Sequence, residues 1–438
     1  MRARMFDAMS VNKMVYDAGI YLARPLVTMA SPFSTKLRKG VQGRRGAPGR
    51  LVEWARSQRR PDQQLVWLHA PSVGESLMAQ AIAEELRALL PDVQIAFTYF
   101  SPSAERMSQN IGADIADYLP WDTSHQVQRV LSALNPTAIA FVRTEIWPTV
   151  VRMAAEREIG LSLVNAVLSV NSSRLNPTSR WLLGPAYKQL TRIGAISQPD
   201  AERFSRLGVA QGRARVTGDA RFDQVYRRIK SLEQDQPLLS RLRDEKVTTI
   251  VAGSTWAADE EELLPAFAAA RKGSPLRLII APHEPDAGNL RALEQRLNKA
   301  GLKHARLAAV QAETGPLPEV IVVDRVGVLA DLYAIATVAY VGGGFHSAGL
   351  HSVIEPAALG IPVIFGPRHG NAREADELTG KGGGFVASDG AAFASLVLDL
   401  ADRPLHRKNS SRAAADFVVS KLGAAKRNAE LIVETMRK

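Results

Sequence analysis

The chain contains no cysteine, which excludes a disulfide framework, a thiolate zinc site and a cysteine nucleophile, and which fits a reducing compartment. Its eight histidines show neither HxH nor HxxxH spacing, so we expect no metal centre. The sequence also lacks a GxGxxG fingerprint, a P-loop lysine signature and a GxSxG nucleophile elbow. These absences disfavour dinucleotide-dependent hydride transfer, ATP hydrolysis and serine-nucleophile chemistry.

Long apolar runs are missing as well. No segment has the roughly 20 apolar residues that cross a bilayer, and no small-residue cleavage site marks a convincing signal peptide. What is present is the composition of a folded globular protein, with 46% hydrophobic and 23% charged residues. A length of 438 residues suits two α/β domains, each of roughly 200 residues.

Positive charge is concentrated at the start of the chain. Residues 1–60 carry thirteen Lys and Arg against three acidic residues, a net charge of +10 out of +11 for the whole chain. Apolar residues recur there at helical spacing, namely Val11, Met14, Val15, Ala18, Leu22, Leu26 and Val27. A basic amphipathic helix predicts peripheral attachment to an anionic membrane surface. The alternative is a helix packed on its own domain with a solvated charge run.

From residue 64 onward, apolar strand-like runs alternate with helical ones, which predicts α/β structure with doubly wound parallel sheets. We expect a basic amphipathic arm (1–60), an N-terminal Rossmann-like domain (61–228), a linker (229–239), a C-terminal Rossmann-like domain (240–405) and one closing helix (406–438). Ligands of such sheets bind beyond the carboxyl ends of the strands, so the loops at those ends are the first candidates for a site.

The stretch 340–378 is the most informative of these. A short strand (337–341) runs into Gly342–Gly344, a helix carrying Glu355 follows, and a second strand (362–365) ends in a Gly-Pro pair. Glycines let a ligand approach the backbone and adopt positive φ, and a helix N-terminus offers N–H groups to phosphate. The stretch predicts a nucleotide-sugar-binding unit, against the alternative of an ordinary strand–turn–helix of an α/β core.

Two carboxylates follow predicted strands of the first domain. Glu75 comes after the strand 65–69, and Glu145 comes after a strand that ends at Val142. Two acids from neighbouring loops can act as a base and an electrostatic support. For Glu75 the alternative is a capping box with Ser72, three residues earlier.

Small and polar residues follow strands of the second domain. Ser254 and Thr255 can donate to a phosphate or cap the acidic helix that begins at Ala257. His283, in the next loop of this kind, is either a ligand contact or a hydrogen-bonded structural histidine.

Six motifs together indicate a resemblance to a known family: HAPSVGES, RTEIWP, GDARFD, AGSTW, PHEP and GLHSVIEPAALGIPVIFGP. In order and spacing they resemble the Kdo transferases, which attach 3-deoxy-D-manno-octulosonate (Kdo) to a lipid A precursor, and the resemblance covers nearly the whole chain. Ser-Val-Gly-Glu with Thr-Glu-x-Trp-Pro is specific to this group. The Glu-Pro-Ala-Ala-Leu-Gly-x-Pro-Val stretch is found more widely, in GT-B glycosyltransferases and epimerases.

The resemblance implies a GT-B fold, with two Rossmann-like domains facing a cleft. It implies a metal-independent inverting transfer without cofactor, with the donor CMP-Kdo on the C-terminal domain and the lipid A precursor on the N-terminal domain. The enzyme would be peripheral on the cytoplasmic face of the inner membrane, and no nucleic acid is expected, since the basic arm lacks interleaved aromatics.

The resemblance also implies roles for residues. Glu75 is the expected general base, and Glu145 and Arg221 are the expected transition-state stabilisers. The expected CMP contacts are Pro282, His283, Gly327, Val328, Leu329, Ser352, Val353, Ile354 and Glu355, the last suited to ribose hydroxyls. Further candidate donor contacts are Ser254, Thr255, Gly343, Gly344, Asn371 and Glu374.

The chain departs from the family pattern at several of these places. Many members have glutamate at Arg143, lysine at Arg221 and asparagine at Ser352, and the usual Pro-Arg-His loop reads Pro282-His283-Glu284, which removes a cation near the nucleotide. Two alternatives therefore stand beside Kdo transfer. One is a GT-B enzyme with another nucleotide sugar or acceptor, and the other is a non-catalytic membrane-bound GT-B scaffold.

Overall fold

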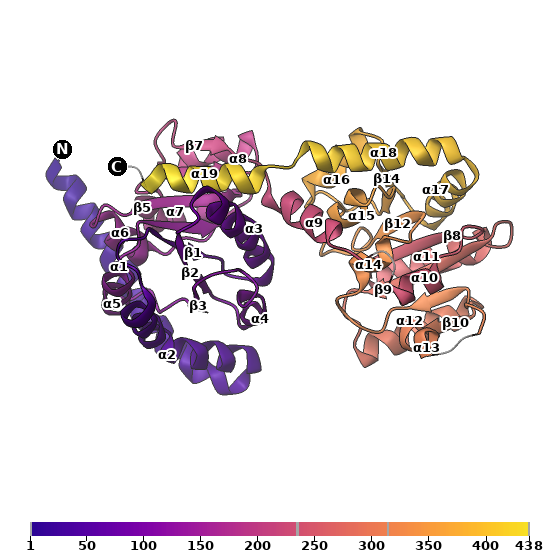
Figure 1. Cartoon of the computed structure of the whole chain (residues 1–438), viewed down its shortest axis with the longest axis horizontal. Helices are drawn as coiled ribbons and strands as arrows, with labels where there is room; N and C mark the ends of the chain where they lie inside the picture. Colours follow the sequence, from indigo (N-terminus) through magenta and orange to yellow (C-terminus); the bar gives the residue numbers. More distant parts are fainter. Residues whose placement is uncertain (1, 234–235, 313–314, 437–438) are drawn as a thin grey trace. The chain divides into compact units, whose positions relative to one another are not determined.

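The structure is a computed structural model that describes residues 2–233, 236–312 and 315–436 (Figure 1). The chain forms two compact units. Unit 1 is Met1–Gln224 with Leu422–Lys438, and unit 2 is Val225–Lys421. In the described residues each unit contains one seven-stranded sheet with parallel pairing throughout, so the predicted α/β class with two doubly wound domains is confirmed.

The sheet of unit 1 has the strand order β3-β2-β1-β4-β5-β6-β7. Its central strands are continuous apolar runs buried on both faces, as expected where helices cover both sides of a parallel sheet. The strands are β1 Leu65–His69, β2 Gln94–Tyr99, β3 Ile115–Tyr118, β4 Ala138–Val142, β5 Gly160–Ala166, β6 Arg192–Ala195 and β7 Ala214–Val216. The helices are α1 Arg2–Ala30, η1 Ser31–Phe33, α2 Thr35–Gln58, α3 Val73–Leu89, η2 Pro102–Ala104, α4 Glu105–Ser108, α5 Ser124–Leu134, α6 Pro148–Ala155, η3 Ser173–Leu175, α7 Pro177–Tyr187, α8 Gln198–Arg203, η4 Phe204–Leu207, α9 Ala220–Lys230 and α19 Ala424–Met436.

The sheet of unit 2 has the order β10-β11-β9-β8-β12-β13-β14. Its strands are β8 Thr248–Thr255, β9 Leu276–Pro282, β10 His304–Arg306, β11 Val320–Val322, β12 Val338–Val341, β13 Val363–Phe365 and β14 Gly384–Val386. Its helices are α10 Pro237–Leu242, α11 Ala257–Ala270, α12 Ala287–Lys299, α13 Leu307–Ala312, α14 Leu329–Tyr333, α15 Ile354–Ala358, α16 Arg373–Gly380, α17 Gly390–Asp402 and α18 Pro404–Ser420.

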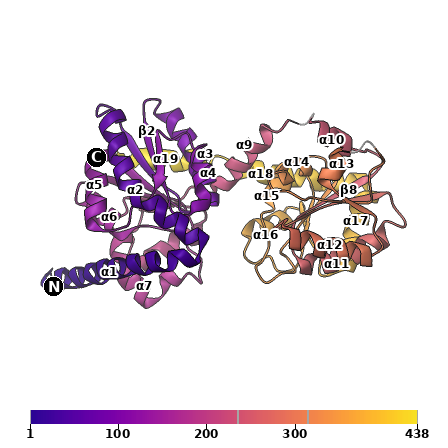
Figure 2. The ribbon, with the colours of Figure 1, turned by 90° about the horizontal axis from the view of Figure 1, so that it is seen from below.

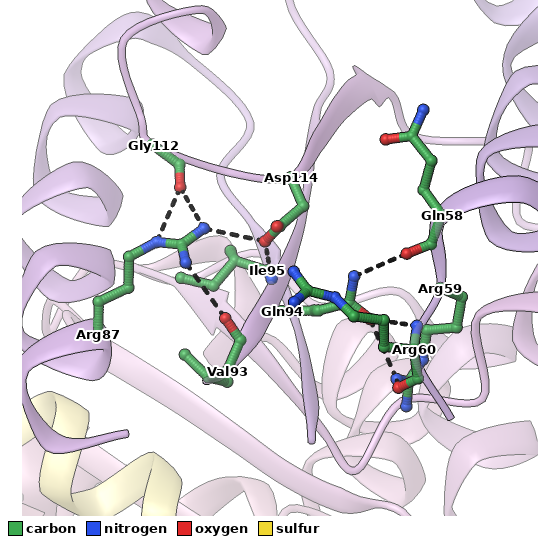
Figure 3. Close-up of polar contacts among 9 residues, drawn as sticks. All are labelled: Gln58, Arg59, Arg60, Arg87, Val93, Gln94, Ile95, Gly112 and Asp114. Atoms are coloured by element: carbon green, nitrogen blue, oxygen red, sulfur yellow. Dashed lines mark hydrogen bonds and ion pairs between the residues drawn. The ribbon is translucent and has the colours of Figure 1, made fainter. Parts of the chain in front are cut away.

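The arm of residues 1–60 consists of two helices with different surroundings. Helix α2 is part of the body of unit 1, because Leu51 and Trp54 are buried in its apolar core. The end of α2 is tied to β2 by the Gln94 side chain, which donates to Gln58 O (3.0 Å) and accepts from Arg60 N (2.7 Å), as Figure 3 shows. The arm is therefore not one uniform membrane segment.

Helix α1 lies along α7 (Figure 2) and leaves a row of apolar side chains exposed. The exposed fractions reach 66% for Met14, 67% for Leu22, 72% for Met29 and 92% for Phe33, just beyond the helix. Met14, Leu22 and Met29 follow one another at intervals of eight and seven positions, so they share one face of α1. Among the described residues, no helix is sufficiently long and apolar to span a bilayer.

The C-terminal part differs from the expected single closing helix. It forms α18, which belongs to unit 2, and α19, which belongs to unit 1 and packs on α3 and β5 (Figure 1). Gly423, with φ of 87°, separates them, a backbone conformation that favours glycine. The division between the units falls inside α9, between Gln224 and Val225, and not in the expected linker 229–239. Residues 234 and 235 of that linker lie outside the described residues.

Three strands, β3, β7 and β10, do not stand out as apolar runs in the sequence. Each has only three or four residues, lies at or next to a sheet edge, and contains polar or charged residues, as in the Ala-Arg-Val of β7. Such segments lack the apolar run that identifies a buried strand, and their pairing depends on a neighbouring strand that is distant in sequence.

Candidate functional site

In unit 1 the strand order reverses between β1 and β4, which pair in parallel. Ligands of doubly wound sheets bind beyond the carboxyl ends of the strands at such a switch point. Glu75 lies in the first turn of α3, directly after β1, and Glu145 lies in the loop after β4. Both side chains are half-buried. The structure therefore brings the two predicted acids to one switch point.

Glu75 does not take part in the capping box that was the alternative for it. Ser72 is the N-cap residue of α3, but its hydroxyl donates to the Glu75 carboxylate instead of accepting a backbone N–H. The Ser76 hydroxyl donates to the Ser72 carbonyl at 2.7 Å. The capping alternative is wrong, because the Ser72 side chain accepts no backbone N–H of the helix.

The loop that carries Glu145 is held rigidly. Tyr187 Oη donates to the Thr144 carbonyl (2.7 Å), and Thr144 Oγ1 donates to the Val167 carbonyl (2.9 Å). Arg143, immediately before, has φ of 80°, a left-handed conformation that is costly for a side chain of this size. Strained backbone that is held in place by its surroundings is concentrated at functional sites.

Burial and three charged groups act on Glu145. Burial raises the pKa of the Glu145 carboxyl, and the neighbouring Glu75 carboxylate raises it further, whereas Arg174 and Arg44 oppose the shift. The net direction is upward. Arg44 comes from α2 and is 5% exposed, with its guanidinium 3.6 Å from the ring centroid of Phe100. The two acids are thus electrostatically coupled and occupy unequal environments, the arrangement that separates a base from a supporting acid.

His69, at the end of β1, supports the same loop. Trp147 Nε1 donates to His69 Nε2 (3.1 Å), and because an indole N–H can only donate, the proton of His69 is on Nδ1, 3.0 Å from Thr98 Oγ1. Burial lowers the pKa of His69 to about 3, so the imidazole is neutral. His69 is a structural support of the loop and no general acid at neutral pH.

Arg221, the third predicted member, lies at the start of α9. Its guanidinium binds the Asp219 carboxylate, at 2.8 Å from Nε and 2.7 Å from Nη2. Burial opposes ionisation of Asp219, but Arg221 and Arg143 outweigh it and hold the pKa of this carboxyl below its usual range. Asp219 therefore orients Arg221 and connects it electrostatically to the Arg143–Trp147 loop.

The arm helix α1 reaches this region too. Buried Asp122 accepts the backbone N–H groups of Thr149 (2.9 Å) and Val150 (3.0 Å), in the first turn of α6 that follows the Glu145 loop. Its third donor is the Tyr16 hydroxyl of α1, at 2.7 Å. Desolvation raises the pKa of Asp122 to about 6. One carboxylate thus joins α1 to the element that begins where the Glu145 loop ends.

In unit 2 the strand order reverses between β8 and β12. Ser254, near the end of β8, has φ of 56°, a second strained position at a switch point. Backbone crowds the glycine run after β12. A Cβ on Gly342 would lie 2.2 Å from Ser254 O, and one on Gly344 would lie 2.4 Å from Gly366 N. These two positions require glycine because backbone packs closely on backbone there. The sequence had suggested the approach of a ligand as the reason.

Asp259, in the first turn of α11, organises the same loop. Its carboxylate accepts from the backbone N–H of Trp256 (2.8 Å) and of Gly343 (2.8 Å), and from Tyr340 Oη (2.8 Å). Because these donors come from the ends of β8 and β12, one buried acid fixes both sides of the switch point. Sequence reasoning missed it, although an Asp four residues after a strand end is a signal of an N-terminal helix turn.

The predicted CMP contacts lie at the end of β9 and in the loops and first helical turns that lead into α14 and α15. Glu355 is in the first turn of α15, and its carboxylate pairs with Arg228 of α9 at 3.2 Å. Burial raises the pKa of Glu355, and Arg228 opposes that shift. Gly327, with φ of 92°, precedes Val328 and Leu329 at the start of α14.

Several side chains of the predicted contacts are hydrogen-bonded to other residues of the protein or are fully buried. Val353 and Ile354 are fully buried, so only their backbone can meet a ligand. Asn371 bridges Leu350, accepting from its N–H (3.0 Å) and donating to its carbonyl (2.9 Å). Thr255 Oγ1 donates to Glu260 (3.3 Å).

The remaining predicted contacts differ in exposure. Ser352 is exposed, and its hydroxyl accepts from Ile354 N at 3.4 Å. Pro282 is buried, the neighbouring His283 is exposed, and Glu374 is 8% exposed in the first turn of α16. In the part of the chain that the structure describes, no group of three or more His, Asp or Glu is arranged to hold a metal ion.

Comparison with known proteins agrees with these motifs. Residues 44–224 match the family model described as 3-deoxy-D-manno-octulosonic-acid transferase (kdotransferase). A 3-deoxy-D-manno-octulosonic acid transferase of Bordetella pertussis is 28% identical over 412 residues, 90% of this chain and 93% of that one. The one of Haemophilus influenzae is 28% identical over 322 residues, 70% of this chain and 71% of that one. The chain is therefore similar to Kdo transferases over most of its length.

Solved structures show the fold to which this chain is similar. A glycosyltransferase from Rickettsia africae matches with a TM-score of 0.59 and 12% identity, over 86% of this chain and all of that one. A UDP-GlcNAc 2-epimerase from Neisseria meningitidis matches with a TM-score of 0.57 and 12% identity, over 85% of this chain and 99% of that one. At such identity the likeness establishes the GT-B fold and leaves the chemistry to the site residues.

Proposed function

We propose that this protein is a Kdo transferase that moves Kdo from CMP-Kdo to a lipid A precursor in lipopolysaccharide core synthesis. The observation that carries the proposal is the pairing of Glu75 and Glu145 at the switch point of unit 1, where the charge of Glu75 helps to raise the pKa of Glu145. If Glu75 served only to cap helix α3, a second acid at the same switch point would not be needed.

In the proposed reaction Glu75 removes the proton from an acceptor sugar hydroxyl. The oxygen then attacks the anomeric carbon of Kdo, a new C–O bond forms with inversion, and the bond to the phosphate of CMP breaks. CMP leaves with the electron pair of that bond. Glu145 and Arg221 stabilise the charge that develops, with Arg221 offsetting the donor carboxylate or the departing phosphate.

The donor is proposed to bind at the switch point of unit 2. The carboxylate of Glu355 suits the ribose hydroxyls, and the backbone at Val353, Ile354 and Gly327 offers donors and acceptors for the nucleotide. Arg228, which pairs with Glu355, orients that carboxylate. We propose that no metal ion or cofactor is needed, because the proton goes to Glu75 and the phosphate charge meets cationic side chains.

The test is Kdo transfer from CMP-Kdo to a tetraacyl lipid A precursor. Glu75→Ala should lower kcat by roughly two to four orders of magnitude, whereas Glu84→Ala, an exposed acid on the same helix, should leave it unchanged. Activity that survives Glu75→Ala sinks the assignment of the base. Loss of activity on dialysis against EDTA, restored by a divalent cation, would contradict metal independence.

We also propose that α1 and η1 bind the cytoplasmic surface of the inner membrane. The support is the exposed apolar row of Met14, Leu22, Met29 and Phe33 beside a strongly basic segment, the two signals that together give stable peripheral attachment. Leu22→Asp with Met29→Asp should abolish cosedimentation with vesicles that contain anionic lipid. Leu405→Asp, at a residue of unit 2 that is 73% exposed, serves as the control. Equal cosedimentation of all three proteins would refute the proposal.

A further inference from the structure

Four aromatic rings stack at the carboxyl edge of the unit 2 sheet. The ring of Trp256 is parallel to that of His346, with centroids 4.3 Å apart and planes at 2°, and it stacks on His283 at 4.6 Å. His351 completes the group, 4.4 Å from His283. These residues, here the imidazole cluster, come from the loops after β8, β9 and β12, so chain segments distant in sequence build it.

Hydrogen bonds determine where two of the imidazoles carry their protons. Trp256 Nε1 can only donate, so His351 Nε2, at 3.1 Å, accepts and the neutral ring has its proton on Nδ1. The backbone N–H of Ala348 donates to His346 Nδ1 (3.1 Å), which leaves the proton of that ring on Nε2. Each neutral ring thus keeps one N–H with which to donate to an oxygen of a ligand.

The framework of the imidazole cluster is rigid. Asp259 holds the backbone of Trp256 and of Gly343, and Asn371 bridges Leu350, the residue before His351. Such anchoring fixes the rings before a ligand arrives, which reduces the entropic cost of binding.

Burial and neighbouring charged groups act on the charge of the imidazole cluster. Burial lowers the pKa of His351, and the neighbouring His283 and His346 lower it further, whereas Asp259 of α11 acts in the opposite direction. Three imidazoles within stacking distance cannot all be protonated at small cost, because like charges repel. The acidic residues that flank His283 in its own loop are Glu284 and Asp286, and Asp286 caps α12.

We propose that the imidazole cluster is a proton-linked subsite for an oxyanion of the donor, which takes up a proton when the anion binds. The inference rests on the proposed function and adds to it the charge source for the donor. An anion beside the rings favours the imidazolium form, and by linkage a lower pH favours the anion. The imidazole cluster thereby supplies conditional positive charge beside the Pro282-His283-Glu284 loop, where many relatives carry a permanent arginine.

The test is calorimetric titration of the full chain with CMP between pH 6 and pH 8, in two buffers of different ionisation enthalpy. The phosphate of CMP titrates in the same range, so the decisive quantity is the difference between the wild type and the variants His346→Gln and His351→Gln. One linked proton changes affinity by up to about tenfold per pH unit. We expect each variant to lose part of the tightening that the wild type shows on acidification, and to take up less proton.

The variant Trp256→Phe provides an independent test. It keeps a ring in the stack but removes the N–H donor to His351 Nε2, so that this nitrogen can accept a proton and uptake should extend to higher pH. His125→Gln, at an exposed residue of α5 in unit 1, is the matched control. Equal thermal melting of all variants without ligand shows that folding is retained.

The outcomes separate this inference from the proposed function. If CMP binds with the same pH dependence in the wild type, His346→Gln and His351→Gln, the proton-linked subsite is refuted while the donor assignment stands. If UDP or GDP binds and CMP does not, the donor assignment fails, and the same comparison is made with the nucleotide that binds. Cytidine and free Kdo identify the oxyanion: an effect of the variants on CMP but not on cytidine assigns the phosphate, and an effect on free Kdo assigns the carboxylate. Absence of binding by every nucleotide contradicts both proposals.

Discussion

At the scale of the residue, the site depends on carboxylates whose surroundings differ. The Glu75 carboxylate accepts from the Ser72 hydroxyl, Glu145 is half-buried beside two arginines and another acid, and Asp219 is paired with Arg221. The first two were predicted as functional from their places after strands. Asp219 was read only as part of a motif, because nothing in its local sequence shows that its carboxylate orients the arginine two residues later.

Asp219→Asn tests this orienting role. The amide keeps the shape of the side chain but removes the charge that holds the Arg221 guanidinium at 2.7 Å, so we expect kcat for Kdo transfer to fall by roughly 10- to 100-fold, the effect of a small misplacement. The KM for CMP-Kdo should change less. Asp416→Asn, which removes an exposed ion pair of α18 with Arg412, is the control. A steady-state measurement in which both variants match the wild type would contradict the role of Asp219.

At the scale of the element, the arm has two functions that its sequence did not separate. Helix α2 contributes Leu51 and Trp54 to the core and buried Arg44 to the surroundings of Glu145. Helix α1 exposes its apolar row and is joined through Tyr16 to Asp122. The amphipathic pattern included Met14 and Leu22 of the exposed row, but a hydrogen bond from Tyr16 to a residue 106 positions later is a tertiary contact.

The pH dependence of stability tests the burial of Asp122. Its folded-state pKa of about 6 lies above the usual value of 3.8, so the folded state binds the proton more tightly than the unfolded state. The resulting stabilisation is complete below pH 4 and is lost as pH rises through 6. Relative to Asp122→Asn, wild type should lose about 1.4 kcal/mol of unfolding free energy from pH 5 to pH 7.5.

Urea unfolding followed by tryptophan fluorescence measures this difference, since five of the six tryptophans lie in unit 1. Asp92→Asn, at an exposed acid of the same unit, is the control and should show no such change with pH. A wild-type minus Asp122→Asn difference that is constant from pH 5 to pH 7.5 would show that Asp122 is ionised in the folded protein across this range.

At the scale of the whole molecule, the chain leaves unit 1 through α9 and returns to it with α19. The returning helix packs so closely that glycines are needed under it. A Cβ on Gly160 would lie 2.3 Å from Thr435 O, and one on Gly194 would lie 2.4 Å from Asn428 Oδ1. Asn428 is fully buried and accepts from the Thr217 hydroxyl at 3.0 Å. Helix α19 is therefore part of the core of unit 1.

Gly194→Ala should therefore destabilise unit 1, by about 1–3 kcal/mol, as overpacking of a full interior does. Gly49→Ala is the matched control, because a Cβ there meets nothing within 4 Å and alanine favours the interior of helix α2. The urea midpoint of Gly194→Ala should fall and that of Gly49→Ala should hold or rise. Equal midpoints for the two variants would mean that α19 is not packed on β6 as the structure has it.

The sequence by itself determined two parallel α/β domains and the acids at their strand ends, because apolar runs, helical spacing and strand-to-helix loops are local signals. Tertiary structure decided that β1 pairs with β4, which makes neighbours of Glu75 and Glu145, and that Gly342 and Gly344 serve backbone packing. It also decided where α19 packs and how Trp256 meets three histidines. These outcomes depend on which distant segments meet, a choice made by the burial and hydrogen bonding of the whole chain rather than by the residues nearby.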